Sequence, residues 1–130
     1  MTDTENLWEQ IYDSFKYHRT ASNPDAQSAM DRIAMKCLGL PKRESFNPMT
    51  CTVREGILSA DSLHDLKLYH SRNQPYHLNG PIVVLIYEGQ KVVIEGNNRV
   101  NAWIAKQLKG PFSVIFVEPR KDAAQQIQHR

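Results

Sequence analysis

Apolar residues recur every three or four positions in the first part of the chain, which is the spacing of an amphipathic helix. Leu7, Ile11 and Phe15 form one such stripe. Thr2 and Glu5, just ahead of it, have the spacing of a capping box, which satisfies free N–H groups at a helix start. We therefore predict a first helix of about three turns that ends near Phe15.

A second helix is predicted between Ser22 and Gly39. Its start places a capping side chain before a proline at the first helical position, in Ser22–Pro24, and Gly39 supplies a stop. Its apolar positions are Ala26, Met30, Ile33, Ala34, Cys37 and Leu38. Because each helix has one apolar face, we expect the two helices to pack together. The charged, proline-containing segment 40–47, which another proline at position 48 follows, is predicted to be a loop.

The middle of the chain predicts a short strand and a third helix. The strand would cover Met49–Val53. Ser59–Asp61 is typical of a helix start, and the third helix is expected to end near Arg72. Its apolar face would be formed by Leu63, Leu66 and Tyr69 or His70. The turn-prone segment 73–81 follows as a loop.

Two apolar runs rich in β-branched residues, Pro81–Tyr87 and Lys91–Glu95, predict a pair of strands. The short connection Glu88–Gln90 predicts a hairpin turn in which Gly89 takes a positive φ. Since both runs are almost continuously apolar, we expect both strands to be central in the sheet.

Helical spacing returns after Arg99 and continues to Leu108, where a basic turn and Gly110 predict the end of a fourth helix. A final strand is predicted from Phe112. The sequence therefore predicts an α+β fold with a mixed sheet that helices cover on one side.

Composition narrows the class of protein without indicating a function. The chain has 130 residues, the size of one domain, and a formal net charge of +2 from 16 basic and 14 acidic residues. This balance gives no overall attraction to DNA or to an anionic membrane. No segment has the length of a signal peptide core or a membrane span, so we expect a cytoplasmic protein with no membrane contact. Cys37 and Cys51 lack metal-ligand spacing, and we expect reduced, partly buried thiols.

The joint between the second run of β-branched residues and the fourth helix carries the candidate chemistry. The first turn of a helix has unpaired N–H groups and a partial positive charge, which together favour an anion. Gly96 allows a phosphate to approach the backbone, and Asn97 and Asn98 can donate to its oxygens. Arg99 can contact a phosphate at two points. Glu95 is the carboxylate placed to hold Mg²⁺ or to orient a water molecule.

The same residues also fit a purely structural interpretation. Gly-Asn-Asn is favourable chemistry for a turn and a helix cap. An arginine in a first helical turn is often solvated or paired with a nearby acid, which here would be Glu95. The spacing alone leaves both interpretations open.

The stretch EGNNRVNAW resembles the motif of the ParB and sulfiredoxin superfamily, in which an acidic residue and a glycine precede an arginine and an alanine. Glu95, Gly96, Arg99 and Ala102 occupy the matching positions. The order of predicted elements over residues 57–119 is also similar to that of ParB N-terminal domains. The resemblance implies a single ParB/sulfiredoxin-like domain over residues 1–130. Its core would be preceded by a helical elaboration at 1–50 and followed by a polar tail at 120–130.

The resemblance also implies a ligand and roles for named residues. ParB relatives hold CTP with Mg²⁺, sulfiredoxins hold ATP, and other members are similar to nucleases or NTPases of plasmids and phages. By this resemblance the phosphate-binding residues would be Gly96, Asn97, Asn98 and Arg99. Glu95 would be a metal-binding and catalytic residue. If the segment 70–80 folds over the site, His70 would serve as a general acid or base, with Arg72 and His77 adding positive charge.

Departures from the superfamily pattern restrict these expectations. Sulfiredoxins have a cysteine where this chain has Asn97, so we do not expect sulfiredoxin chemistry. ParB proteins have glutamate and arginine where this chain has Asn97 and Asn98, which removes a metal-holding carboxylate and a phosphate-binding charge. Too few residues follow Pro119 for a helix-turn-helix and a dimerisation domain, so a partitioning clamp is not expected.

Three functions remain open at this point. The first is a Mg²⁺-dependent NTPase or nuclease acting on a nucleotide or on DNA. The second is a non-catalytic nucleotide-binding module or inhibitor, and the third is a plasmid or phage accessory protein that binds a protein partner through its helical first half. Among the other candidates, His64 is expected to be a surface residue, Trp103 a core residue, and Lys42 and Arg43 exposed charges.

Overall fold

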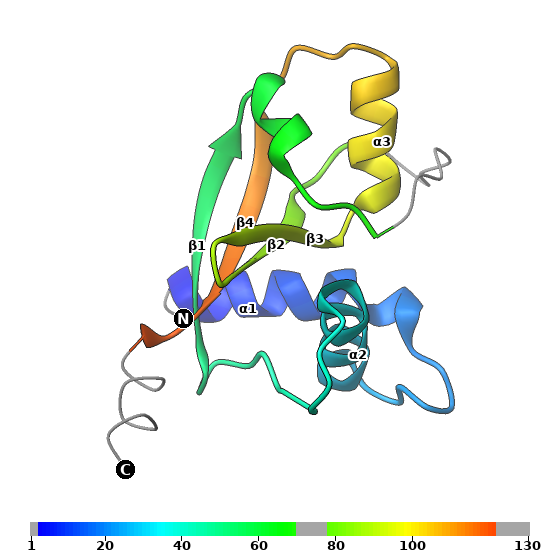
Figure 1. Ribbon diagram of the computed structural model, residues 1–130, viewed down its shortest axis with the longest axis vertical. Coiled ribbons are helices and arrows are strands. Elements are labelled where there is room, and N and C mark those ends of the chain that lie inside the picture. Colours follow the sequence, from blue (N-terminus) through cyan, green and yellow to red (C-terminus); the bar gives the residue numbers. More distant parts are fainter. Residues whose placement is uncertain (1–2, 70–77, 122–130) are drawn as a thin grey trace.

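Four strands form one mixed sheet at the centre of the computed structural model, which describes residues 3–69 and 78–121 (Figure 1). The strands are β1 (Cys51–Leu58), β2 (Ile82–Tyr87), β3 (Gln90–Glu95) and β4 (Phe112–Pro119). Their order across the sheet is β1-β4-β2-β3. β4 runs antiparallel to β1 and parallel to β2, and β2 and β3 form an antiparallel hairpin.

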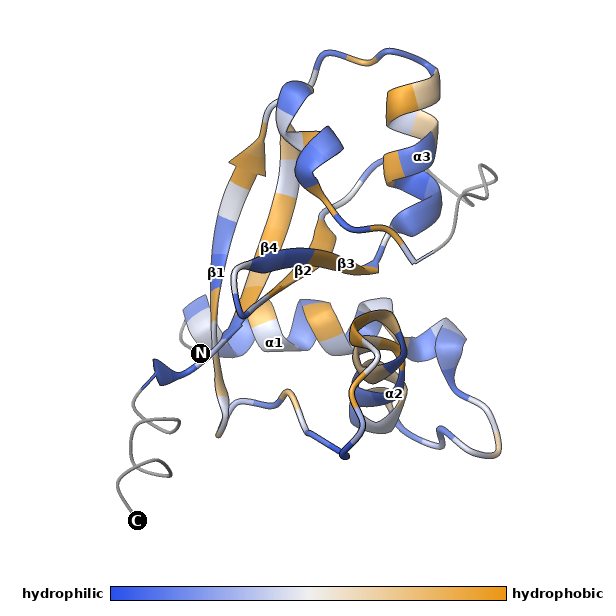
Figure 2. Cartoon of the chain, viewed as in Figure 1, coloured by the Kyte–Doolittle hydropathy of each residue, from blue (hydrophilic) through white to orange (hydrophobic). Residues whose placement is uncertain are grey.

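Helices cover both faces of this sheet, which corrects the expectation of one covered face. The helices are α1 (Asp3–Ser14), η1 (Lys16–His18), α2 (Ala26–Leu38), η2 (Asp61–Asp65) and α3 (Asn97–Ala105). In Figure 1, α1 and α2 lie below the sheet and α3 lies above it. Figure 2 shows the largely apolar β2 and β4 between these two layers. The fold is therefore α+β, as predicted, with three layers.

The continuous apolar run of β2 explains why both faces are covered. Side chains alternate between the two faces of a strand. Val83 and Leu85 accordingly pack in the core cluster beneath the sheet, together with residues of α1 and α2. Ile82 and Val84 pack in the opposite cluster, together with Val100 of α3. A strand that is apolar at every position can be stable only where both of its faces are buried.

The β2–β3 hairpin confirms the predicted turn and corrects the predicted place of one strand. Gly89 has a φ of 80°, and Glu88 before it has a φ of 49°, so both central residues of the turn are left-handed. β3, however, lies at the edge of the sheet and is not central. Its outer side is paired only at a bridge between Lys67 and Val92 in the described part of the chain.

The predicted third helix was wrong beyond its first turn. η2 is a 3-10 helix that ends at Asp65, and Leu66 is already extended with a ψ of 136°. Lys67 then pairs with β3, donating its N–H to the carbonyl of Lys91 and accepting from the N–H of Val93. Pairing with a strand therefore overrides the helical spacing, while Leu66 still reaches the core. The expected end of this helix, near Arg72, lies outside the described residues.

Several boundaries also differ from those predicted. The short strand expected at Met49–Val53 is the eight-residue β1. The second helix begins after Asp25, whose side chain accepts the N–H of Ser28, so the proline does not occupy the first helical position. Gly39 ends this helix in the left-handed conformation, as predicted. The fourth helix ends at Ala105, earlier than expected. No helix in the described ranges is long and apolar enough to cross a membrane.

Candidate functional site

Gly96 forms the joint between β3 and α3. Its φ is 103°, a left-handed value that favours glycine, and a Cβ placed there would lie 2.5 Å from a methyl carbon of Ile82. The first main-chain hydrogen bond of α3 runs from the N–H of Val100 to the carbonyl of Gly96, over 3.0 Å. The N–H groups of residues 97–99 therefore have no intrahelical acceptor, as at any helix start.

Arg99 is buried and links the segment before β2 to the end of β3. Only 6% of its surface is exposed. Its Nη1 donates to the carbonyls of Asn79, Gly80 and Pro81 over 3.0–3.3 Å, just before β2. Its Nη2 forms an ion pair with Glu95 at the end of β3. Contact between this guanidinium and a phosphate would require these partners to be exchanged.

The side chain of Asn97 is also engaged in hydrogen bonds within the protein. It is buried, with 6% of its surface exposed. Its Nδ2 donates to the carbonyl of Val93 over 2.8 Å, and its Oδ1 accepts the main-chain N–H of Tyr69. The side chain thus joins β3 to the segment that follows η2. This contact gives Asn97 a structural role that its position in the motif did not reveal.

Asn98 differs from both of its neighbours. Its Oδ1 is buried and has no hydrogen-bond partner within residues 3–69 and 78–121. A buried polar atom without a partner is uncommon, because its desolvation is not compensated. Among the described residues, the Oδ1 of Asn98 therefore has unused capacity to accept a hydrogen bond.

Glu95 is held in its pair with Arg99, and its side chain is 15% exposed. In the part of the chain that the structure describes, no group of three or more His, Cys, Asp or Glu side chains could hold a metal ion. His70, Arg72 and His77 lie outside the described residues, so the expected acid or base is not placed. The carboxylate of Glu95 is the one predicted metal ligand, and its charge is balanced by a guanidinium.

Comparison with known proteins assigns no family or function to this joint. The chain matches no protein-family model, no curated protein and no solved structure. The resemblance to the ParB and sulfiredoxin superfamily rests on the EGNNRVNA stretch and on the order of elements. It stays a prediction.

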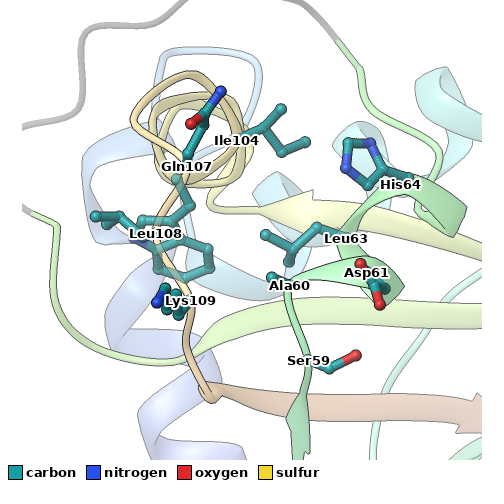
Figure 3. Close-up of a pocket in the computed structure, with 10 residues that line it drawn as sticks. Ser59, Ala60, Asp61, Leu63, His64, Ile104, Gln107, Leu108 and Lys109 are labelled. Atoms are coloured by element: carbon teal, nitrogen blue, oxygen red, sulfur yellow. The ribbon is translucent and has the colours of Figure 1, made fainter.

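A hollow of about 440 Å³ opens elsewhere, between η2 and the segment after α3 (Figure 3). Figure 3 shows Asp61 and His64 on one side of it and Leu108 and Lys109 on the other. A second hollow of about 440 Å³ lies beside β1. Neither of these two hollows is lined by residues 95–99.

The remaining candidates have structural surroundings. Trp103 is 3% exposed, stacks on Phe112 with ring centroids 4.4 Å apart and donates to the carbonyl of Leu78, so the core interpretation is confirmed. Cys37 and Cys51 are buried free thiols. Burial raises the pKa of Cys37 to about 11, which keeps this thiol protonated near neutral pH.

Proposed function

We propose that the chain binds a phosphate-bearing ligand, a nucleotide or a nucleic-acid backbone, at the first turn of α3. The single observation that carries this proposal is the start of α3, where the left-handed Gly96 precedes three N–H groups, of residues 97–99, that have no intrahelical acceptor. The main-chain N–H groups of the first turn would face the phosphate, and the Nδ2 of Asn98 would donate a further hydrogen bond to it. The resemblance implies ATP or CTP with Mg²⁺ as the ligand.

In this proposal the protein acts as a binding module rather than as a fast NTPase or nuclease. Glu95 would have to leave its ion pair with Arg99 before it could hold Mg²⁺ or activate water. Releasing one partner of a buried pair is costly, because it leaves the other charge uncompensated. Arg99 and Glu95 are therefore positioning residues that hold Gly96 and Asn97 in place, and Asn98 is the ligand-binding side chain.

The test compares two changes of an amide to an acid. Asn98→Asp places a negative charge at the proposed phosphate position, and Gln90→Glu makes the same charge change at an exposed site at the start of β3. The helix dipole favours an acid in the first turn, so we expect Asn98→Asp to remain folded. Thermal shift and calorimetry with ATP, CTP, GTP and UTP, with and without Mg²⁺, would measure binding.

We expect one nucleotide to raise the melting temperature of the parent and of Gln90→Glu, because a ligand that binds only the folded state stabilises it. Asn98→Asp should lose this shift. If the parent responds to no nucleotide and to no single-stranded oligonucleotide, the phosphate proposal is abandoned. If Asn98→Asp binds as tightly as the parent, the ligand lies elsewhere.

The second candidate function is a non-catalytic interaction or inhibitor protein on the same fold. The observation that favours it is on the surface: Ile57 in β1 is 71% exposed, and Tyr17 and Met49 are more exposed still. Of these, Ile57 lies on an outer strand of the sheet, where an exposed apolar side chain is suited to contact with a protein partner. Failure of every nucleotide in the assay above would leave this candidate as the better one.

A further inference from the structure

β1 is an outer strand of the sheet, and one of its two edges has no described neighbour. It pairs with β4 along its whole length, from Cys51 opposite Pro119 to Leu58 opposite Phe112. No strand follows β1 on its other side in the sheet order. In Figure 1, β1 lies at the left margin of the sheet. An outer strand of this length presents a row of main-chain groups that can pair with another chain.

The register shows which main-chain groups point outward. Arg120 donates its N–H to the carbonyl of Thr50 over 2.9 Å, in the pair that continues the ladder of β1 and β4 by one step. In an antiparallel ladder, hydrogen-bonded pairs alternate with pairs whose groups point away. The groups of Val53, Glu55 and Ile57 therefore point away from β4. None of the three has a main-chain hydrogen bond to another described residue on that side.

The side chains along this edge are suited to a partner strand. Arg54 and Glu55 are exposed and carry opposite charges, and Arg54 lies over the ring of Phe116 at 4.4 Å. Ile57 is 71% exposed on the face that α1 covers elsewhere. A hollow of about 440 Å³, lined by Ile57 and by Gln10 of α1 among others, opens on this face. A partner side chain next to Ile57 would therefore find apolar surface.

We propose that β1 accepts an extended segment of another protein as an added antiparallel strand. Main-chain hydrogen bonds to Val53, Glu55 and Ile57 would hold the segment, and side chains would select it. Opposite charges across a strand pair are favourable, so the segment carries an acidic residue opposite Arg54 and a basic residue opposite Glu55. This proposal does not depend on the phosphate site at α3.

A second copy of the chain fits this edge poorly. Two copies of one strand that pair antiparallel are related by a two-fold axis perpendicular to the sheet, so one residue must face its own copy. The two registers with the greatest overlap centre on Arg54 or on Glu55. Each places two like charges directly opposite one another, which is destabilising. The charges of β1 thus favour a different chain as the partner.

Two synthetic peptides of equal composition test the proposal. TVYKEVTV, aligned antiparallel from Leu58 to Cys51, places lysine opposite Glu55 and glutamate opposite Arg54. TVYEKVTV reverses these two charges and is the matched control. Binding would be followed through the amide NMR signals of the intact chain and through hydrogen exchange.

We expect TVYKEVTV to bind about tenfold more tightly than TVYEKVTV, since two favourable pairs replace two unfavourable ones. The amides of Val53, Glu55 and Ile57 have no acceptor in β4, so we expect them to exchange fast in the free protein and to be slowed by the peptide. If neither peptide protects these amides at about 1 mM, or if both bind equally, the proposal is overturned. Self-association that slows the same amides without any peptide would assign the edge to a second copy and overturn it too.

Protein variants provide an independent check. The double variant Arg54→Glu with Glu55→Arg should invert the preference between the peptides. Ile57→Pro removes an outward N–H without removing a hydrogen bond to β4, so it should fold and lose peptide binding. Ile57→Thr keeps the N–H and is the control for the lost side chain. Binding by Ile57→Pro at the affinity of Ile57→Thr would refute strand addition, even if the double variant fails to fold.

Discussion

Replacement of Arg99 by methionine tests whether the guanidinium holds the loop or is free for a ligand. The change keeps the length of the side chain but removes a donor to three carbonyls and the partner of Glu95. Removing one member of a buried pair typically costs 3–5 kcal/mol, because an uncompensated charge remains. Glu95 keeps 15% of its side chain exposed, so we expect a loss of about 3 kcal/mol, near the low end of that range.

Denaturant unfolding followed by circular dichroism would measure the free energy of unfolding. For a chain of this size the loss corresponds to a fall in melting temperature of about 10 °C. Arg43→Met, at an exposed loop position, is the control and should change stability by less than about 0.5 kcal/mol. In a double-mutant cycle, adding Glu95→Gln to Arg99→Met should cost less than the two single changes together.

The opposite result would be equally informative. If Arg99→Met loses less than about 1 kcal/mol, the contacts to residues 79–81 contribute little to stability. The guanidinium could then turn toward a ligand at small cost, and the division of roles between Arg99 and Asn98 would be refuted.

Three further predictions concern stability and reactivity. Gly96→Ala should destabilise the fold by about 2 kcal/mol or more, measured by thermal melting, since the new Cβ meets Ile82 at 2.5 Å in a left-handed backbone; a neutral effect would contradict the tight joint. Asp31→Asn should cost about 1–3 kcal/mol by urea unfolding, because the carboxylate accepts from three donors, which are in Gln27, Ser45 and Phe46. Alkylation of Cys37 in the native protein should stay slow at pH 8 and rise toward pH 11, as followed by mass spectrometry, since burial raises its pKa to about 11. Because this pKa is raised from 9.0, the protonated thiol stabilises the fold below about pH 9, and that contribution is lost between about pH 9 and pH 11; alkylation as fast as in unfolded protein would show that the thiol is accessible.

The sequence predicted elements well where a local pattern and the final packing agree. The stripe of Leu7, Ile11 and Phe15 and the left-handed stop at Gly39 both depend on neighbours within a few residues. The hairpin at Gly89 is equally local. The helix predicted after Asp65 was wrong, because the conformation of this segment depends on pairing with β3, which lies far along the chain.

The candidate site shows the same division. The motif located the joint, and helix geometry placed unpaired amides there, but the partners of Arg99 are carbonyls of residues 79–81. A carbonyl has no signature in the sequence, so only the fold could show that the guanidinium is engaged. The outer edge of β1 was missed for a related reason: strand order is not encoded in the hydrophobicity of one strand. The sequence feature that could have indicated this edge is the pair of charged residues Arg54 and Glu55 next to Ile57, because adjacent charges are unusual in a buried strand.

The position of β4 between β1 and β2 has a consequence for how the chain acquires its structure. β4 is the last of the four strands along the chain, yet it lies between β1 and β2, which both come much earlier in the sequence. While a ribosome is still making residues 112–119, β1 has no sheet to join, and the hairpin lacks its parallel neighbour. Contacts between distant segments slow folding, so the four-stranded sheet is expected to be completed only once this strand is available.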